Sequence, residues 1–198
     1  MTTRVIVPHR GLDASKSRLS PVLSPDERGE LAAHLLRRVL RIARQAVSDV
    51  VVISPSADLD ELVQPTGARL LVQRGMGLNA GLDQAREAAV AEGVEALAVL
   101  HGDLPELDVS DVLALVSAVP GDGGVAIAPD RAGSGTNGLA LSPPGVIPFR
   151  FGVGSFSAHR EAAESAGASF VIVERPGLAF DLDTPDDLDE WLRSGVLA

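Results

Sequence analysis

The chain of 198 residues contains no cysteine, and only 3% of its residues are aromatic. Without cysteine there are no disulfides, no thiolate zinc sites and no thiol nucleophiles. Because aromatic side chains are so few, Ala, Val and Leu must fill the core. Hydrophobic residues make up 45% of the chain, which is enough for a sizeable core. Such a composition is typical of layered helices and sheets.

Positive charge is also scarce. The chain has 17 basic and 27 acidic side chains, which give a net charge of −10. This balance argues against a nucleic-acid-binding surface, which needs a basic footprint. It argues equally against electrostatic binding to anionic membranes. It does not exclude phosphorylated small molecules, because a divalent cation held by carboxylates supplies positive charge locally.

Long hydrophobic runs are missing as well. No stretch approaches the roughly 20 apolar residues that a membrane span needs, and the first residues lack the pattern of a signal peptide. We therefore expect a soluble, cytoplasmic protein. The length suits one domain, and no repeat or linker interrupts the chain, so residues 1–198 are expected to form a single domain. A homodimer is compatible with this organisation.

Short β-branched runs alternate with longer helical patterns along the chain. Strands are expected at residues 4–7, 50–53, 68–72, 96–100, 125–128, 138–141 and 170–173. Helices are expected from residue 25, at 78–91, 110–118 and 155–166, and from residue 185, with Ser24, Ser110 and Thr184 as caps. This alternation predicts a three-layer α/β fold, with a mostly parallel sheet and helices on both faces. Glycine-rich segments at 121–124 and 133–138 are expected to be loops.

Three aspartates stand where ligands bind in such sheets, beyond the carboxyl ends of strands. Asp103 closely follows the apolar strand 96–100, in a Gly-Asp-Leu-Pro turn. Asp181 and Asp183 are two residues apart, so in an extended segment their carboxylates point the same way and can converge on one cation. Oxygen ligands without cysteine favour magnesium or manganese over zinc. Each aspartate also has a structural explanation, as a turn or helix-start residue.

Two segments have the composition of nucleotide-binding loops. The loop after the first strand carries Arg10, Lys16 and Arg18 with a glycine and hydroxyls, which can wrap a polyphosphate, although the Walker A order is absent. Residues 75–81 place glycines before a helix, and Asn79 offers a donor and an acceptor for a base edge. The alternatives are an ordinary basic surface loop and a helix N-terminal turn.

Two further clusters of glycines and hydroxyls, at residues 133–138 and 151–156, can hold an anion. The second opens a helix, whose first N–H groups attract a phosphate or carboxylate. Turn chemistry is the alternative for both. His159 lies one helical turn after Ser155 and is interpreted as a partly buried structural histidine. No nucleophile elbow and no Ser–His–Asp arrangement is present.

Six segments of the chain, in sequence order, are V-P-H-R-G-L-D-A-S-K-S-R-L, G-L-N-A-G-L, G-D-L-P-E-L, A-P-D-R-A-G-S-G-T-N-G-L, F-G-V-G-S-F-S-A-H and D-L-D-T-P-D-D-L. Together they resemble the guanylyltransferase family of coenzyme F-420 biosynthesis, whose members act on phosphoenolpyruvate or 2-phospho-L-lactate. The resemblance spans the whole chain. It implies a glycosyltransferase A-like, Rossmann-like nucleotidyltransferase fold. It also implies transfer of GMP from GTP to a phosphorylated acid, with release of pyrophosphate.

The resemblance also assigns roles to individual residues. It implies Mg2+ binding by Asp103, Asp181 and Asp183, acceptor binding by Thr136, Gly152 and Ser155, contacts to the nucleotide phosphates by Arg10, Lys16 and Arg18, and a guanine contact by Asn79. The acceptor that we expect is phosphoenolpyruvate, giving enolpyruvyl-diphospho-5'-guanosine, with 2-phospho-L-lactate as the alternative. His9 and the His101-Gly102 pair depart from the usual family pattern.

The expected reaction is an in-line attack by an acceptor phosphate oxygen on the α-phosphorus of GTP. That phosphate is already ionised at neutral pH, so positioning and charge neutralisation are enough and no general base is required. Two other hypotheses stay open at this point. One is a different nucleotidyltransferase of the same fold. The other is a catalytically silent nucleotide-binding module that acts through a partner, against which the three aspartates and the acceptor clusters argue.

Overall fold

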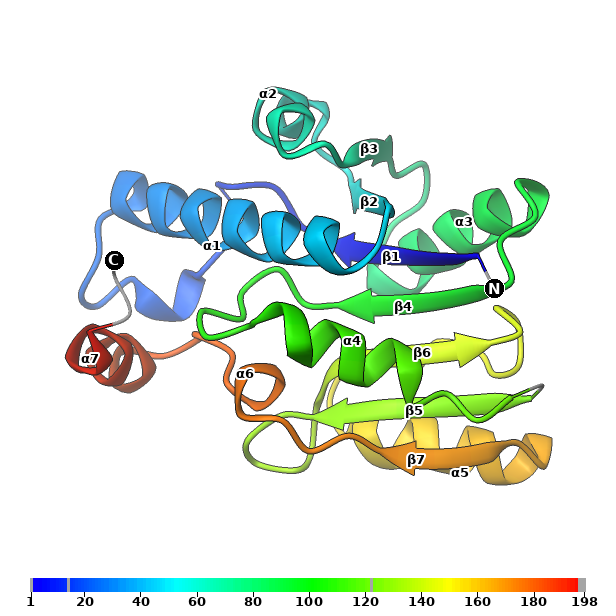
Figure 1. Cartoon of the computed structure of the whole chain (residues 1–198). Helices are drawn as coiled ribbons and strands as arrows, with labels where there is room; N and C mark the ends of the chain where they lie inside the picture. Colours follow the sequence, from blue (N-terminus) through cyan, green and yellow to red (C-terminus); the bar gives the residue numbers. More distant parts are fainter. Residues whose placement is uncertain (1, 14, 122, 196–198) are drawn as a thin grey trace.

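The computed structural model describes residues 2–13, 15–121 and 123–195. Within them, one seven-stranded sheet with the order β3-β2-β1-β4-β6-β5-β7 carries helices on both faces (Figure 1). The strands are β1 (Thr3–Pro8), β2 (Asp49–Ser54), β3 (Arg69–Val72), β4 (Ala96–Leu100), β5 (Gly124–Pro129), β6 (Thr136–Ser142) and β7 (Ser169–Ile172). Only β6 runs antiparallel to its neighbours, β4 and β5, among the described strands. The predicted mostly parallel α/β sheet is confirmed.

Helices form the two outer layers, apart from α7, which lies beyond the ends of the strands (Figure 1). They are α1 (Pro25–Ala46), α2 (Asp60–Val63), α3 (Leu78–Ala91), α4 (Val109–Ser117), α5 (Ser155–Ala166), α6 (Pro176–Ala179) and α7 (Pro185–Ser194). In Figure 1, α1 and α4 lie in front of the sheet, whereas α3 and α5 lie behind it. No helix in the described part of the chain is long and apolar enough to cross a bilayer.

Alternation along the central strands divides the core into two apolar layers. Val5 and Val7 of β1 pack with Leu36 of α1, while Ile6 between them packs with Leu82 of α3 on the other face. All five residues of β4 are buried, as expected for a strand covered on both sides. The sheet is therefore rigid where it carries Asp103 at its edge.

Several local predictions need correction. The α4 cap is Asp108, whose side chain accepts a hydrogen bond from the Ser110 N–H at 2.6 Å, and not Ser110. β6 is longer than expected, because Thr136 pairs with Pro129 and so belongs to the sheet and not to a glycine-rich loop. The short helices α2 and α6 were not predicted, since four residues are too few to show a helical period. Ser24 and Thr184 cap α1 and α7 as predicted.

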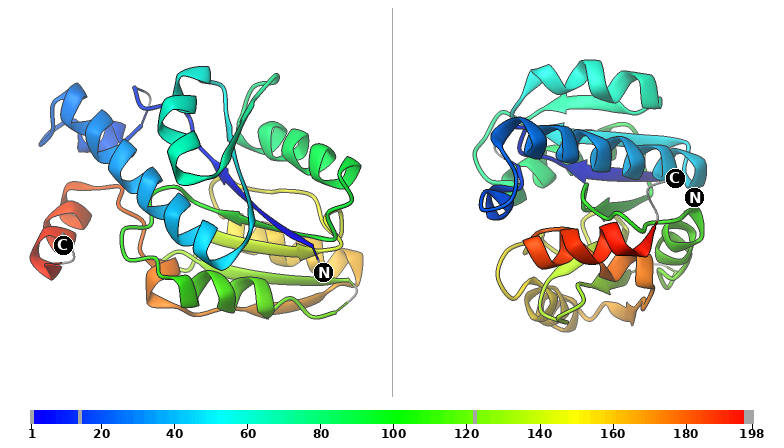
Figure 2. Two further views of the ribbon diagram at one scale, coloured as in Figure 1. Left: turned by 45° about the horizontal axis from the view of Figure 1, so that its top comes forward. Right: turned by 90° about the vertical axis from the view of Figure 1, so that its left-hand side faces the viewer.

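A third apolar cluster fixes the C-terminal segment. Phe180, Leu182 and Trp191 pack with Leu19 of the first loop and Leu35 of α1. This packing holds α7 at the carboxyl ends of β1 and β4, on the left of Figure 1. The right-hand view of Figure 2 looks onto this end of the sheet, with α7 in red below α1 in blue. As a result, residues 181–183 are carried back to the edge where β4 ends.

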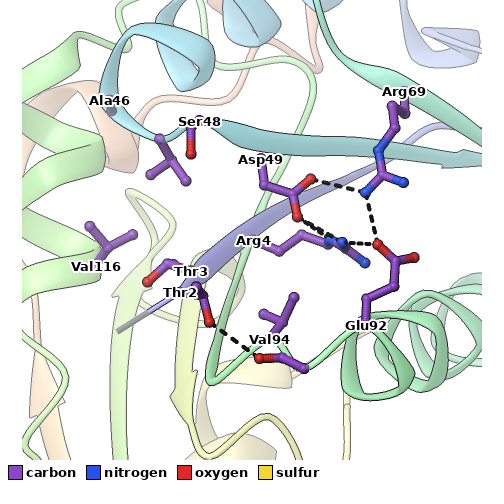
Figure 3. Close-up of a pocket in the computed structure, with 12 residues that line it drawn as sticks. Thr2, Thr3, Arg4, Ala46, Ser48, Asp49, Arg69, Glu92, Val94 and Val116 are labelled. Atoms are coloured by element: carbon purple, nitrogen blue, oxygen red, sulfur yellow. Dashed lines mark hydrogen bonds and ion pairs between the residues drawn. The ribbon is translucent and has the colours of Figure 1, made fainter.

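The opposite edge of the sheet is closed by a ring of charges around a hollow of about 600 Å3 (Figure 3). Arg4, which is 3% exposed, contacts Asp49 and Glu92 at 2.7 Å each. Arg69 contacts the same two carboxylates at 3.1 and 3.3 Å. Partial burial opposes the ionisation of Asp49, but the hydrogen bonds and charges of both arginines outweigh it and lower its pKa. Because these four groups satisfy one another, we interpret the ring as a structural tie between β1, β2, β3 and α3.

Arg4→Met should therefore lower the free energy of unfolding at pH 7 by about 1–3 kcal/mol, less than for a fully buried pair because both carboxylates are partly exposed. The folded-state pKa of Asp49 is depressed, so its contribution is complete above the unfolded pKa and is lost as the pH falls through the folded one. Urea unfolding should thus show a difference between wild type and variant that narrows below about pH 4.

Arg69→Met serves as the matched control, since Arg69 is 56% exposed and its loss should be smaller at every pH. An Arg4→Met effect that is independent of pH between 7 and 3 would show that the ring stabilises by packing and not by charge.

Candidate active site

A cavity of about 640 Å3 opens at the carboxyl ends of β1 and β4. Its walls come from the first loop, from residues 73–78 before α3, from the turn after β4 and from the segment before α7. This is the edge at which parallel α/β sheets bind ligands. Of the predicted site residues, the cavity brings together Asp103, Asp181, Asp183, Arg10, Lys16 and Arg18.

The three aspartates are placed by one main-chain contact. The Leu182 N–H donates to the Asp103 carbonyl at 3.1 Å, which ties the segment before α7 to the turn after β4. The Leu182 side chain is fully buried, so Asp181 and Asp183 on either side of it both face the cavity. Asn137 of β6 donates to Asp181 Oδ1 at 3.1 Å and to the Ala179 carbonyl at 3.2 Å.

Lys16, the only lysine of the chain, bends back into this group of acids. Its Nζ donates to Asp103 Oδ2 at 2.7 Å, to Asp183 Oδ1 at 3.3 Å and to the Leu182 carbonyl at 2.5 Å. Its side chain is 5% exposed. Lys16 is also the only non-glycine residue with a positive φ, 56°, among those described. That conformation costs about 1–2 kcal/mol, so the three contacts must hold the loop in this shape.

The charges of the cavity are strongly coupled. Burial, and then the neighbouring carboxylates of Asp103 and Asp183, raise the pKa of Asp181, although its hydrogen bond from Asn137 opposes the shift. Burial also disfavours ionised Asp103, but the charge and hydrogen bond of Lys16 outweigh it and lower the pKa of Asp103. The acids at this edge of the sheet therefore need a cation close to them.

The described side chains do not gather three carboxylates or imidazoles at metal-binding separation. The predicted convergence of three carboxylates on one ion is thus not formed in this arrangement, because the Lys16 ammonium lies between Asp103 and Asp183. The donor set nevertheless suits a hard divalent cation, since it offers carboxylate oxygens and the Leu182 carbonyl. Asp103 Oδ1 is buried and has no hydrogen-bond partner, as expected of a ligand atom. The metal role of the three aspartates stays a prediction.

The predicted acceptor residues lie beside this cavity in a buried hydroxyl–imidazole network. Ser155 Oγ donates to Thr136 Oγ1 at 3.1 Å, and Thr136 Oγ1 lies 3.2 Å from His159 Nδ1. The Arg150 N–H donates to His159 Nε2 at 3.0 Å, so the imidazole proton is on Nδ1. His159 is fully buried, and desolvation lowers its pKa to about 4. It is a neutral structural residue that orients Thr136.

The three predicted acceptor residues do not line the cavity itself. Thr136 and Ser155 are each 2% exposed, and only Gly152, with φ 139°, is exposed. The network still reaches the aspartates, because Asn137, next to Thr136, holds Asp181. Sequence reasoning missed Asn137, although its place in a Gly-Thr-Asn-Gly segment between two expected strands was the available signal.

Asn79 is used differently from its predicted guanine contact. Its amide donates to the Phe151 carbonyl at 3.0 Å and accepts from the Phe151 N–H at 2.9 Å. It thereby ties the start of α3 to the loop at residues 150–154. The neighbouring glycine turn is shaped by Gln73, which donates to the Gly75 and Gly77 carbonyls at 2.7 and 2.8 Å. Gln73 lines the cavity and was also missed from the sequence.

Sequence comparisons show which known proteins this chain resembles. A family model described as "Guanylyl transferase CofC like" matches residues 3–196. The chain is 46% identical to the phosphoenolpyruvate guanylyltransferase of Rubrobacter xylanophilus, covering 98% of this chain and 96% of the relative. It is 34% identical to the 2-phospho-L-lactate guanylyltransferase of Methanothermobacter thermautotrophicus, covering 98% and 86%.

The fold has solved counterparts as well. A nucleotidyl transferase from Methanothermobacter superposes with a TM-score of 0.71 at 16% identity, covering 98% of this chain and 99% of that one. At this identity the likeness concerns the fold, which is that of a nucleotidyltransferase, as the sequence predicted. The family model and the relatives above 30% identity show the family as well as the fold. Together they establish that the chain belongs to the CofC-like guanylyl transferase family.

Proposed function

We propose that this protein is a phosphoenolpyruvate guanylyltransferase that acts in coenzyme F-420 biosynthesis in the cytoplasm. The observation that carries the proposal is one cavity in which three carboxylates meet the basic first loop, in a member of the guanylyl transferase family. The acceptor is chosen from the relatives. The identity to a phosphoenolpyruvate enzyme is 46%, against 34% for a 2-phospho-L-lactate enzyme.

The reaction joins the two substrates through the α-phosphate of GTP. A phosphate oxygen of phosphoenolpyruvate attacks the α-phosphorus, the bond to the bridging oxygen of the β-phosphate breaks, and pyrophosphate leaves. No proton has to be removed from the attacking phosphate. The residues of the cavity therefore align two polyanions and neutralise their charge.

Asp103, Asp181 and Asp183 would hold Mg2+, which when bound neutralises the phosphates that face these acids. Lys16 has to leave its contacts with Asp103 and Asp183 for such an ion to bind, and its ammonium is then free to contact a phosphate. Arg18 is 73% exposed and 3.3 Å from Asp183, so it can turn towards the nucleotide at little cost. Arg10 lines the same wall.

Thr136, Gly152 and Ser155 are proposed to form the acceptor side. His159 holds Thr136 and Ser155 in place from within, while the loop at Gly152 is open to the ligand. Asn79 contributes by fixing Phe151, and so this loop, relative to the nucleotide wall. A direct contact between Asn79 and guanine remains part of the proposal only if the amide exchanges its partners when GTP binds.

Asp103→Asn should lower GMP transfer by about a hundredfold or more, because it removes a carboxylate that would hold the cation facing the reacting phosphates. Pyrophosphate release with GTP, Mg2+ and phosphoenolpyruvate measures the loss, and circular dichroism checks the fold. Asp186→Asn, an exposed acid of the α7 first turn, is the matched control and should retain activity. Near-wild-type turnover by Asp103→Asn would refute the role of this carboxylate.

Lys16→Met should bind divalent cations more tightly, since the competing ammonium is gone, while the KM for GTP rises by about tenfold. Titration with Mn2+ followed by electron paramagnetic resonance measures the first effect, and initial rates measure the second. Lys16→Arg keeps the positive charge, so its Mn2+ affinity and its KM for GTP should lie between those of wild type and Lys16→Met. Weaker Mn2+ binding by Lys16→Met would show that Lys16 supports the cation site instead of competing for it.

An acceptor panel tests the choice of acid. With GTP and Mg2+, phosphoenolpyruvate should give the highest kcat/KM, ahead of 2-phospho-L-lactate and 3-phospho-D-glycerate, with the product identified by mass spectrometry. Preference for phospholactate would change the acceptor but not the enzyme class. Transfer to a sugar phosphate and to none of these acids would contradict the proposed function.

A further inference from the structure

Asn79, the second residue of α3, connects two segments that the proposed function assigns to different substrates. Its amide nitrogen donates to the Phe151 carbonyl at 3.0 Å, and its amide oxygen accepts from the Phe151 N–H at 2.9 Å. The reverse amide orientation would set two donors and two acceptors against each other, so this pairing fixes the orientation. Both ends of the amide are thereby occupied, and Asn79 is not among the residues that line the cavity.

The α3 end of this contact adjoins the proposed nucleotide wall, which is formed by residues 73–78. Gly77 and Leu78, directly before Asn79, line the cavity. Gly77 is the N-cap of α3 and provides no side-chain cap, so the first N–H groups of this helix are available to a ligand. A nucleotide bound along this wall therefore contacts the residues next to Asn79, and not its amide.

The Phe151 end of the contact belongs to the loop at residues 150–154, which contains Gly152 of the proposed acceptor side. Two consecutive residues of this loop are held from different helices. The N–H of the residue before Phe151 donates to His159 Nε2 of α5 at 3.0 Å, and the Phe151 main chain is held by Asn79 of α3. Directly after them, Gly152 is exposed and has a φ of 139°. The position of the exposed part of the loop therefore depends on these two anchors.

The Phe151 ring extends the connection to the buried hydroxyls of the proposed acceptor side. The ring is buried and meets the His159 ring edge-on, with 4.8 Å between centroids. His159 Nδ1 lies 3.2 Å from Thr136 Oγ1, to which Ser155 Oγ also donates. Because side chains in such a core are closely packed, a displacement of Phe151 would also displace these hydroxyls.

We propose that Asn79 is a positioning residue that couples the two substrates. A nucleotide bound at the start of α3 holds the loop at residues 150–154, through Asn79 and Phe151, in the shape that binds the acceptor acid. This inference rests on the proposed function and extends it, since it assigns Asn79 to acceptor binding in place of the predicted guanine contact. Coupling of this kind is reciprocal, so each substrate should tighten the binding of the other.

Calorimetric titration measures the coupling directly. The Kd of a GTP analogue with an α,β-methylene bridge is determined with and without phosphoenolpyruvate, always with Mg2+. In wild type, phosphoenolpyruvate should lower this Kd by a coupling factor of about five or more. Asn79→Leu removes both hydrogen bonds at similar side-chain volume and should reduce the coupling factor by about threefold or more. The Kd of the analogue measured alone should change by less than about twofold, because Asn79 does not contact the nucleotide in this role.

Gln84 offers a matched control on the same helix. Its amide makes the same kind of paired contact, accepting from the Arg74 N–H at 2.8 Å and donating to the Val72 carbonyl at 3.0 Å. These partners do not belong to the acceptor loop, so Gln84→Met should leave the coupling factor unchanged. Asn79→Asp still accepts from the Phe151 N–H but cannot donate to its carbonyl, and its coupling factor should lie between those of wild type and Asn79→Leu. Thermal unfolding checks the fold of each variant.

Hydrogen exchange followed by mass spectrometry gives a readout that needs no acceptor. The Phe151 N–H is bonded to Asn79, so its exchange rate reports on this contact. Addition of the GTP analogue and Mg2+ alone should slow exchange at residues 150–154 of wild type by about threefold or more, and should have no such effect in Asn79→Leu.

The outcomes distinguish this inference from the function on which it rests. If wild type transfers GMP to no phosphorylated acid, the proposed function fails, whereas hydrogen exchange with the GTP analogue still tests the connection through Asn79. If wild type is active but its ligands bind without coupling, or Asn79→Leu keeps the wild-type coupling factor, the inference alone is overturned. A Kd for the analogue alone that rises by about tenfold in Asn79→Leu, with unchanged coupling, would assign Asn79 to guanine. Should Asn79→Leu not fold, Asn79→Asp decides, because wild-type coupling in that variant contradicts the proposal.

Discussion

Repulsion among three carboxylates at the end of one sheet is the constraint to which the rest of this site is adjusted. The Asp103 carbonyl accepts from the Leu182 N–H, and this contact brings Asp181 and Asp183 beside Asp103. The α7 cluster around Trp191 holds that segment in place. Burial, and then the neighbouring carboxylates, raise the pKa of Asp181. Lys16 brings a positive charge to Asp103 and Asp183, with its backbone in a left-handed conformation.

Two groups of structural elements lie on either side of these aspartates. The proposed nucleotide wall comprises β1, β2 and the start of α3, with glycine turns shaped by Gln73. The proposed acceptor side comprises β6 and the start of α5, where buried Thr136, Ser155 and His159 hydrogen-bond to one another. Asn79 joins the start of α3 to the loop at Phe151. Asn137 joins β6 to Asp181. Because β6 is antiparallel to β4, its first residues, and not its last, lie at the edge of the sheet where β1 and β4 end.

Much of the fold could be predicted from local signals. Buried β-branched runs gave the strands, and a hydroxyl cap followed by proline located the starts of α1 and α7. Asp103 could be found because it follows an apolar strand, and Asp181 and Asp183 because their two-residue spacing directs both carboxylates to one side. That all three line one cavity agrees with this prediction, whereas their binding of a metal remains to be tested.

The features that could not be predicted depend on distant partners. Lys16 turning back onto Asp103 joins residues 87 positions apart, and the Asn79 contacts with Phe151 span 72 positions. The burial of Thr136 and Ser155 follows from the extension of β6, which only the pairing with β5 reveals. The sequence predicts residue types suited to a polyanion site, whereas the partners of these residues follow from the tertiary structure.

The central claim is that these carboxylates form the cation site at which a nucleotide and a phosphorylated acid meet. The most direct measurement is a crystal structure with Mn2+, a non-transferable GTP analogue and phosphoenolpyruvate, with the metal located by anomalous scattering. The account predicts an anomalous peak about 2.0–2.3 Å from oxygens of Asp103 and of Asp181 or Asp183, with Lys16 moved onto a phosphate. A metal bound elsewhere, with Lys16 still paired to Asp103 in the full complex, would contradict it.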